Sequence, residues 1–173
     1  MIAMEVLGVR IELPANQPLV LLKESHGERH LPIWIGAPEA SAIELAQQGI
    51  VPPRPMTHDL MVSVIGQLGA ELTQVHIIAV RDAVFYAQLV FGSGVTVSSR
   101  ASDAIAMAIR VDCPILCTPE VLDDAGVQIT EAGEVTEEDD EAGGARPSDE
   151  NAESELRRFR QFLDDVEPED FEN

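Results

Sequence analysis

Apolar and polar residues alternate along the first part of the chain, and this pattern predicts β-strands. Every second residue from Leu7 to Leu13 is apolar, a period of two that turns one face of an extended strand toward a core. Trp34, the only tryptophan, falls on the opposite face of its strand from the neighbouring isoleucines, and we assign it to the core rather than to ligand stacking. The pattern predicts strands over residues 2–13, 19–24 and 30–35.

Two helices are predicted between these strands and the next group. Pro38 suits a first helical turn because proline has no N–H to lose, and Gly49 ends the segment, so a helix is expected from Pro38 to about Gln48. Thr57 is expected to cap a second helix. Its apolar residues recur at helical spacing and predict a buried stripe of Leu60, Met61, Val64, Ile65 and Leu68.

The second half of the domain repeats the order of strands followed by a helix. From Ala101 the apolar period becomes helical, with Ser99 or Ser102 available as a cap. The elements together predict an α+β domain over residues 1–130, with a mixed, largely antiparallel sheet of about seven strands and three to four packed helices. The later segments are strands over 71–80, 84–91, 95–97 and 114–118, and helices from 101 and over 119–125.

The distribution of charge sets the C-terminal end of the chain apart from the predicted domain. Residues 1–130 hold 14 acidic and 7 basic residues, whereas residues 131–173 hold 17 acidic and 4 basic ones. The second range is too polar to offset its chain entropy, which predicts an acidic, mostly disordered tail with a short helix at 155–165. The chain has one lysine, Lys23, which argues against a broad basic surface for nucleic acid but leaves room for a local arginine cleft.

The cysteines and the hydropathy pattern indicate the cellular compartment in which the protein is expected. Cys113 and Cys117 have no histidine nearby, which argues against a zinc site and favours buried free thiols in a reducing cytoplasm. No window approaches the roughly 18 apolar residues of a membrane span, and the first residues lack the pattern of a secretory signal. We therefore expect a cytoplasmic protein that does not enter a membrane.

Polar residues that could carry chemistry gather at the starts of the predicted helices. The segment Arg54–Asp59 joins a histidine, which titrates near neutral pH, to an acid that can hold a divalent metal. A structural alternative exists at the same positions, because Asp59 and Asp103 also favour helix N-termini and Arg100 can form an ion pair with Asp103. From these residues alone, capping is favoured over catalysis.

Four segments of the chain resemble the signatures of the bifunctional nuclease domain family. They occur in the family's order and are well spaced over about residues 2–130. Ala101 stands where the family usually has proline, and the layout with an acidic tail is similar to actinobacterial members. The segments are Leu31–Gly36 followed by Glu39-Ala40, Arg54–Leu60, Phe85–Leu89 and Ser99–Ala106.

The resemblance implies an α+β domain that self-associates, with a dimer favoured, and a nuclease acting on RNA or DNA. Under this hypothesis His58 is the acid or base, and a divalent metal such as Mg²⁺ or Mn²⁺ neutralises phosphate charge. The site would consist of catalytic His58, Asp59 and Asp103, substrate-binding Arg54, Arg100 and Ser102, and metal-binding Asp59, Asp103 and Glu39.

A second hypothesis is a non-catalytic binding or assembly protein. In it the same residues serve as helix caps and ion pairs. The acidic tail then recruits a basic partner of unknown identity, or keeps the protein from binding nucleic acid.

Overall fold

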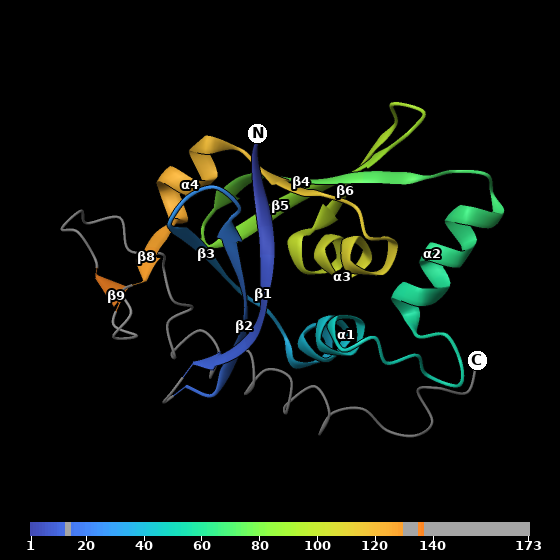
Figure 1. The fold of residues 1–173 in the computed structure, drawn as a ribbon, viewed down its shortest axis with the longest axis horizontal. Helices are drawn as coiled ribbons and strands as arrows, with labels where there is room; N and C mark the ends of the chain where they lie inside the picture. The colour runs from blue at the N-terminus through green and yellow to red at the C-terminus, as the bar shows by residue number, and fades with distance from the viewer. Residues whose placement is uncertain (13–14, 130–134, 137–173) are drawn as a thin grey trace, which may run out of the picture. The chain divides into compact units, whose positions relative to one another are not determined.

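Two antiparallel three-stranded meanders, joined by a short strand, form the sheet (Figure 1). The structure is a computed structural model that describes residues 1–12, 15–129 and 135–136, all within one compact unit. The first meander is β1 (Ile2–Glu12), β2 (Gln17–Glu24) and β3 (Arg29–Trp34). The second is β4 (Leu72–Arg81), β5 (Val84–Phe91) and β6 (Thr96–Arg100).

The joining strand is β7 (Ile115–Cys117), which pairs antiparallel with β1 and parallel with β4. Two short strands, β8 (Val127–Ile129) and β9 (Val135–Thr136), extend the sheet beyond β3. Among the described residues this gives nine strands in the order β6-β5-β4-β7-β1-β2-β3-β8-β9. The edge strand β6 leads directly into a helix, which places the end of β6 beside the helical layer.

The helices are α1 (Ala37–Gln47), α2 (Thr57–Gln67), α3 (Ala101–Val111) and α4 (Pro119–Ala125). Helix α1 follows the first meander and α3 the second, and the two lie side by side (Figure 1). The small side chains of α3 allow close packing, and its fully or largely buried residues are Ala101, Ser102, Ala104, Ile105, Ala106, Met107 and Ala108. None of the described helices is long and apolar enough to cross a lipid bilayer.

The predicted α+β class and the mostly antiparallel sheet are confirmed, and the strand count differs for a simple reason. The two extra strands contain two and three residues, which is too short for a period of two to be recognised. Strand β9 lies inside the range 131–173 that the sequence assigned to a tail. The rest of that tail, with the helix expected at 155–165, lies outside the described residues.

Two expectations about single side chains were wrong. Trp34 is 38% exposed rather than part of the core, and its indole N–H donates to Glu12 Oε2 at 3.0 Å. An amphipathic ring at the end of a strand can keep its polar edge paired and its face exposed. Thr57 is the first helical residue and not the cap, because Met56 holds the N-cap position.

The serine caps expected for α3 are also absent, since Arg100 is the N-cap residue and makes no side-chain cap hydrogen bond. Both cysteines are free, as expected, but only Cys117 is buried, whereas Cys113 is half-buried. Burial raises the pKa of the Cys117 thiol to about 12 and also raises that of Cys113. Neither side chain is therefore a reactive thiolate at neutral pH.

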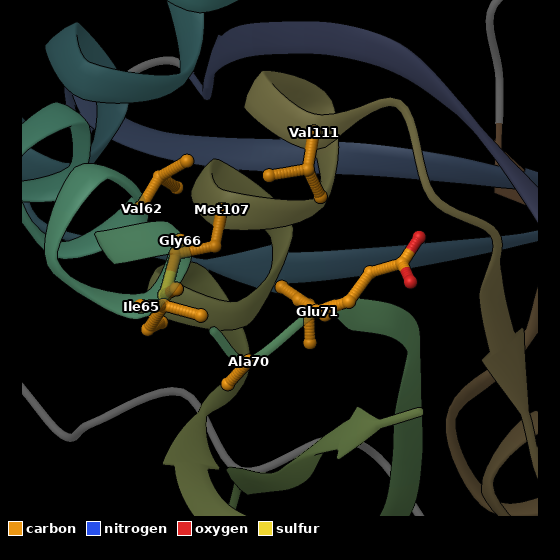
Figure 2. A pocket seen from close by; sticks show the side chains of 8 residues that line it. Val62, Ile65, Gly66, Ala70, Glu71, Met107 and Val111 are labelled. Atoms are coloured by element: carbon orange, nitrogen blue, oxygen red, sulfur yellow. The ribbon is translucent and has the colours of Figure 1, made fainter. Parts of the chain in front are cut away.

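The largest difference concerns α2, in which no residue is buried. Val62 and Ile65 pack against the core cluster, and Figure 2 shows them facing Met107 and Val111 of α3 around a pocket of about 250 Å³. Helical spacing correctly identified an apolar face, but it does not say what covers that face. The exposed members of the predicted stripe are Leu60, Met61, Val64 and Leu68.

Candidate active site

The N-terminal turns of three helices meet at one groove of about 670 Å³. Each turn contains free backbone N–H groups and the positive end of a helix dipole, so their convergence favours an anion. The floor and walls are largely apolar, with Leu89 and Val97 contributed by the second meander. The helical lining residues are Pro38, Glu39 and Ala42 of α1, Met56, Thr57, His58 and Met61 at α2, and Arg100, Asp103 and Met107 at α3.

Four charged or titratable side chains form a continuous chain of contacts in this groove. His58 Nε2 lies 3.0 Å from Asp103 Oδ1. Arg100 donates from Nε to Asp103 Oδ2 at 2.7 Å and from Nη2 to Asp103 Oδ1 at 3.1 Å. The remaining arm of Arg100 reaches Glu39, with Nη1 3.0 Å from Oε1. Residues from three helix starts are thus joined in the order Glu39, Arg100, Asp103 and His58.

The electrostatics of the groove centre on Asp103. Burial raises the pKa of Asp103, but hydrogen bonds from Arg100 and then from His58 outweigh burial, so its pKa lies below the ordinary value. The carboxylate is therefore charged at neutral pH and can hold the imidazole ring in one orientation. The Arg100 side chain is 67% exposed while the His58 side chain is only 12% exposed. An anion entering from solvent would meet Arg100 first.

Asp59 takes the capping role that the residues alone favoured, and it also forms an ion pair that the sequence did not predict. Its Oδ1 accepts from Arg110 Nε at 2.5 Å, and its Oδ2 accepts from the backbone N–H of Met56 at 2.9 Å. Arg110 also donates to the backbone carbonyls of Ala42 and Ala106. Asp59 does not line the groove, so the structure separates it from Asp103 and ties α2 to α3 through an ion pair.

Replacing Asp59 with asparagine is expected to destabilise the fold by about 1–3 kcal/mol at pH 7, since a charge-assisted hydrogen bond to Arg110 is lost. The hydrogen bond from Arg110 and then that from Met56 lower the pKa of Asp59 below 3.8. The stabilisation is therefore fully present above pH 3.8 and disappears as the pH falls through the native-state pKa. Urea unfolding of the wild type and Asp59→Asn between pH 7 and pH 3 measures it.

The matched control is Asp124→Asn, at an exposed aspartate of α4. It is expected to leave the unfolding free energy within about 0.5 kcal/mol of the wild type. A gap between the wild type and Asp59→Asn that widens as the pH falls below 4 would contradict the assigned role of the ion pair.

The other predicted site residues are not brought into this network. Arg54 is exposed in the segment before α2 and does not line the groove. Ser102 is buried in α3 and does not line the groove either. Sequence reasoning missed the pairing of Arg110 with Asp59 across 51 positions, because no local pattern connects residues so far apart.

The carboxylates do not form a cluster suited to a metal ion as they stand. The Arg100 guanidinium contacts both Glu39 and Asp103, so a cation already occupies the position between them. Asp59 uses its two oxygens elsewhere. Within the described residues, no group of three His, Cys, Asp or Glu side chains could hold a metal. We therefore derive no catalytic step through a metal.

The structure is an α+β domain with a groove at the point where the N-termini of three helices meet. Comparison with known proteins shows the family to which this domain belongs. Residues 20–130 match the bifunctional nuclease domain, and the chain belongs to that family. It is 46% identical over 166 residues to "Uncharacterized protein Rv1829" of Mycobacterium tuberculosis strain H37Rv, covering 96% of this chain and 95% of the relative. The same values hold for "Uncharacterized protein MT1877" of Mycobacterium tuberculosis strain CDC 1551.

Proposed function

We propose that the groove hydrolyses phosphodiester bonds of RNA or DNA. One observation carries this proposal: the exposed Arg100 and the His58–Asp103 pair lie together where three helix N-termini meet. A phosphodiester needs an anion site and a group that moves a proton, and the groove supplies both. Membership of the bifunctional nuclease domain family supports the same activity.

His58 acts as the general base in this proposal. Because Nε2 is hydrogen-bonded to Asp103, Nδ1 is the nitrogen that takes a proton from the attacking water. The water oxygen forms a bond to phosphorus, the bond from phosphorus to the leaving oxygen breaks, and that oxygen receives a proton from His58 or from solvent. Asp103 fixes the ring and stabilises the imidazolium that forms.

Arg100 and the helix N-termini stabilise the charge that develops on the phosphate. Arg100 is already paired with two carboxylates, so the substrate approaches its solvent-facing side. The acidic neighbours weaken this attraction, which predicts modest substrate affinity in a chain whose formal net charge is −20. The Mg²⁺ or Mn²⁺ ion expected from the sequence stays a prediction, and no step of the proposed mechanism depends on it, because the carboxylates of the groove do not form a site for a metal within the described residues.

The non-catalytic assembly protein remains the second candidate, and one observation favours it. Glu39, His58, Asp59, Arg100 and Asp103 are all engaged in ion pairs, as expected of purely structural residues. Self-association, a partner for the acidic tail and a cytoplasmic location also stay predictions. The two candidate functions differ in one measurable property, which is cleavage of RNA or DNA.

The test is cleavage of end-labelled single-stranded RNA and DNA by the purified full chain, with EDTA and with added Mg²⁺ or Mn²⁺. Asp103→Asn is expected to lower kcat by at least about 10²-fold, because the histidine loses its orienting carboxylate. Asp112→Asn is the matched control beside α3, at an exposed position with φ 55° that asparagine tolerates. Equal cleavage by both variants would assign the activity to a contaminant or another site.

A further inference from the structure

The groove offers more apolar surface than a phosphate group requires. A phosphate needs hydrogen-bond donors and positive charge, which Arg100 and the helix N-termini supply. Leu89 and Met107 line the groove and are almost fully buried, so they form a floor. Met61 of α2 and Val97 of β6 are 42% and 47% exposed and form its apolar walls. A groove of about 670 Å³ with such a lining favours a ligand that has an apolar face beside its charged group.

Methionine is concentrated in this groove. Three of the five methionines in the chain line it, namely Met56, Met61 and Met107. The thioether of methionine is polarizable, adapts its shape, and packs favourably against aromatic rings. The apolar part of the groove therefore suits a flat aromatic ring.

The free edge of the sheet adds backbone hydrogen-bonding groups to the same groove. Strand β6 is an edge strand, and its residue Ser98 lines the groove. The N–H of Phe91 donates to the carbonyl of Val95 at 2.9 Å. Because hydrogen-bonded pairs alternate along an antiparallel ladder, Val97 and Ser99 turn their backbone groups toward β5, and Ser98 turns its groups away. The N–H and carbonyl of Ser98 thus provide a donor and an acceptor side by side, which is the pattern that the edge of a nucleobase can pair with.

Charge alone does not explain how this chain would hold a nucleic acid strand. Residues 1–130 hold 14 acidic and 7 basic residues, and among the described residues that line the groove only Arg100 has a permanent positive charge. Binding that relies on phosphate contacts needs several cations. Contact with a base does not need them, because apolar and polarizable side chains pack against the face of the ring. Base contact therefore provides an attraction that the acidic chain otherwise lacks.

We propose that the apolar part of the groove is a subsite for one unpaired nucleobase. The base contacts Met61 and Val97, and its hydrogen-bonding edge faces the backbone of Ser98. Val97 precedes Arg100 by three residues on one strand, about 10 Å, so the base belongs to the nucleotide whose phosphate Arg100 binds or to its neighbour. The inference rests on the proposed function, because it takes the ligand to be a nucleic acid strand.

Nuclear magnetic resonance on the full chain tests the subsite without a cleavage assay. With ¹³C in the methionine methyl groups, Met56 and Met61 report from the groove, while Met1 and Met4 do not line it and serve as internal controls. Adenosine 5′-monophosphate is expected to shift the signals of Met56 and Met61, because an aromatic ring changes the magnetic field at a methyl group that it contacts. Ribose 5-phosphate has the same sugar and phosphate but no base, and it is expected to leave both signals in place. Adenosine 5′-monophosphate should also bind at least about 5-fold more tightly, the lower end of what one stacked base contributes.

Two results would overturn the subsite. Equal shifts from the two ligands would mean that the groove binds phosphate alone. The same conclusion against the subsite follows if Met56 and Met61 do not move at about 10 mM nucleotide, which is well above a millimolar Kd. Cleavage of RNA or DNA together with either result would retain the proposed function and remove the subsite, whereas base-dependent shifts without cleavage would do the reverse.

A variant of one wall gives a second measurement. Met61→Ala is expected to weaken binding of adenosine 5′-monophosphate by about 5-fold and to leave binding of ribose 5-phosphate unchanged, because only the base contacts Met61. Leu60→Ala is the matched control, since Leu60 is also an exposed apolar residue of α2 but does not line the groove, and it should bind both ligands like the wild type. Wild-type affinity for the nucleotide in Met61→Ala, or an equal loss in both variants, would contradict the proposal.

Discussion

Replacing His58 with glutamine is expected to lower kcat for phosphodiester cleavage by about 10²–10⁴-fold, the usual contribution of a positioned general base. Glutamine retains a hydrogen bond to Asp103 but cannot take a proton from water. The side chain is 12% exposed and lies on a helix with no buried residue, so the fold should tolerate the change. Cleavage rates at saturating substrate, together with thermal unfolding, separate lost chemistry from lost structure.

The matched control is His76→Gln on β4. His76 bonds to Gln74 at 2.9 Å and does not line the groove, so this variant should retain wild-type kcat. A base must be unprotonated to act, and the wild-type rate is therefore expected to fall at acid pH. The base assignment is wrong if His58→Gln keeps the wild-type rate and the same pH profile.

Replacing Arg100 with glutamine is expected to reduce kcat/KM by about 10²-fold, because the groove loses the cation that meets the phosphate. Arg100→Lys should recover only part of the loss, since lysine keeps the charge but cannot span Asp103 and the phosphate with a planar fork. Substrate affinity measured against salt concentration gives a second readout. Loss of one phosphate contact should reduce the slope of that dependence by about 1.

Arg81→Gln is the control for removal of a surface arginine. Arg81 lies on β4 with its guanidinium carbon 5.6 Å from the centre of the Tyr86 ring, and it does not line the groove. Its loss changes the net charge by the same amount as Arg100→Gln. If both variants lose activity equally, the effect is one of overall charge, and Arg100 is not a specific phosphate ligand.

The sequence predicted those parts of the fold that rest on local periodicity. Strands such as β5, observed over Val84–Phe91, and the α4 bounds Pro119–Ala125 agree with the pattern, because one period runs through the whole segment. Trp34 and the apolar residues Leu60, Met61, Val64 and Leu68 at α2 were expected to be buried but are exposed, and the reason is the same for both. A period shows which residues share a face, but the cover of that face comes from distant parts of the chain or from another molecule.

The candidate site was only half predictable for the same physical reason. Polar residues at helix starts pointed to Arg100, Asp103 and His58, and the expected ion pair between Arg100 and Asp103 is confirmed. The sequence alone could not show that the adjacent residues His58 and Asp59 belong to two different hydrogen-bond networks. His58 forms a hydrogen bond with Asp103, and Asp59 forms one with Arg110. Which partner each residue meets depends on how α2 packs against α3.

The central claim is that His58 and Asp103 act as one catalytic unit in the groove. The most direct test is a double-mutant cycle of His58→Gln and Asp103→Asn, measuring kcat for cleavage of the same labelled strand. The double variant is expected to be no slower than His58→Gln alone, because Asp103 acts through a base that is already gone. Rate losses that multiply in the double variant, or no loss in any variant, would contradict it.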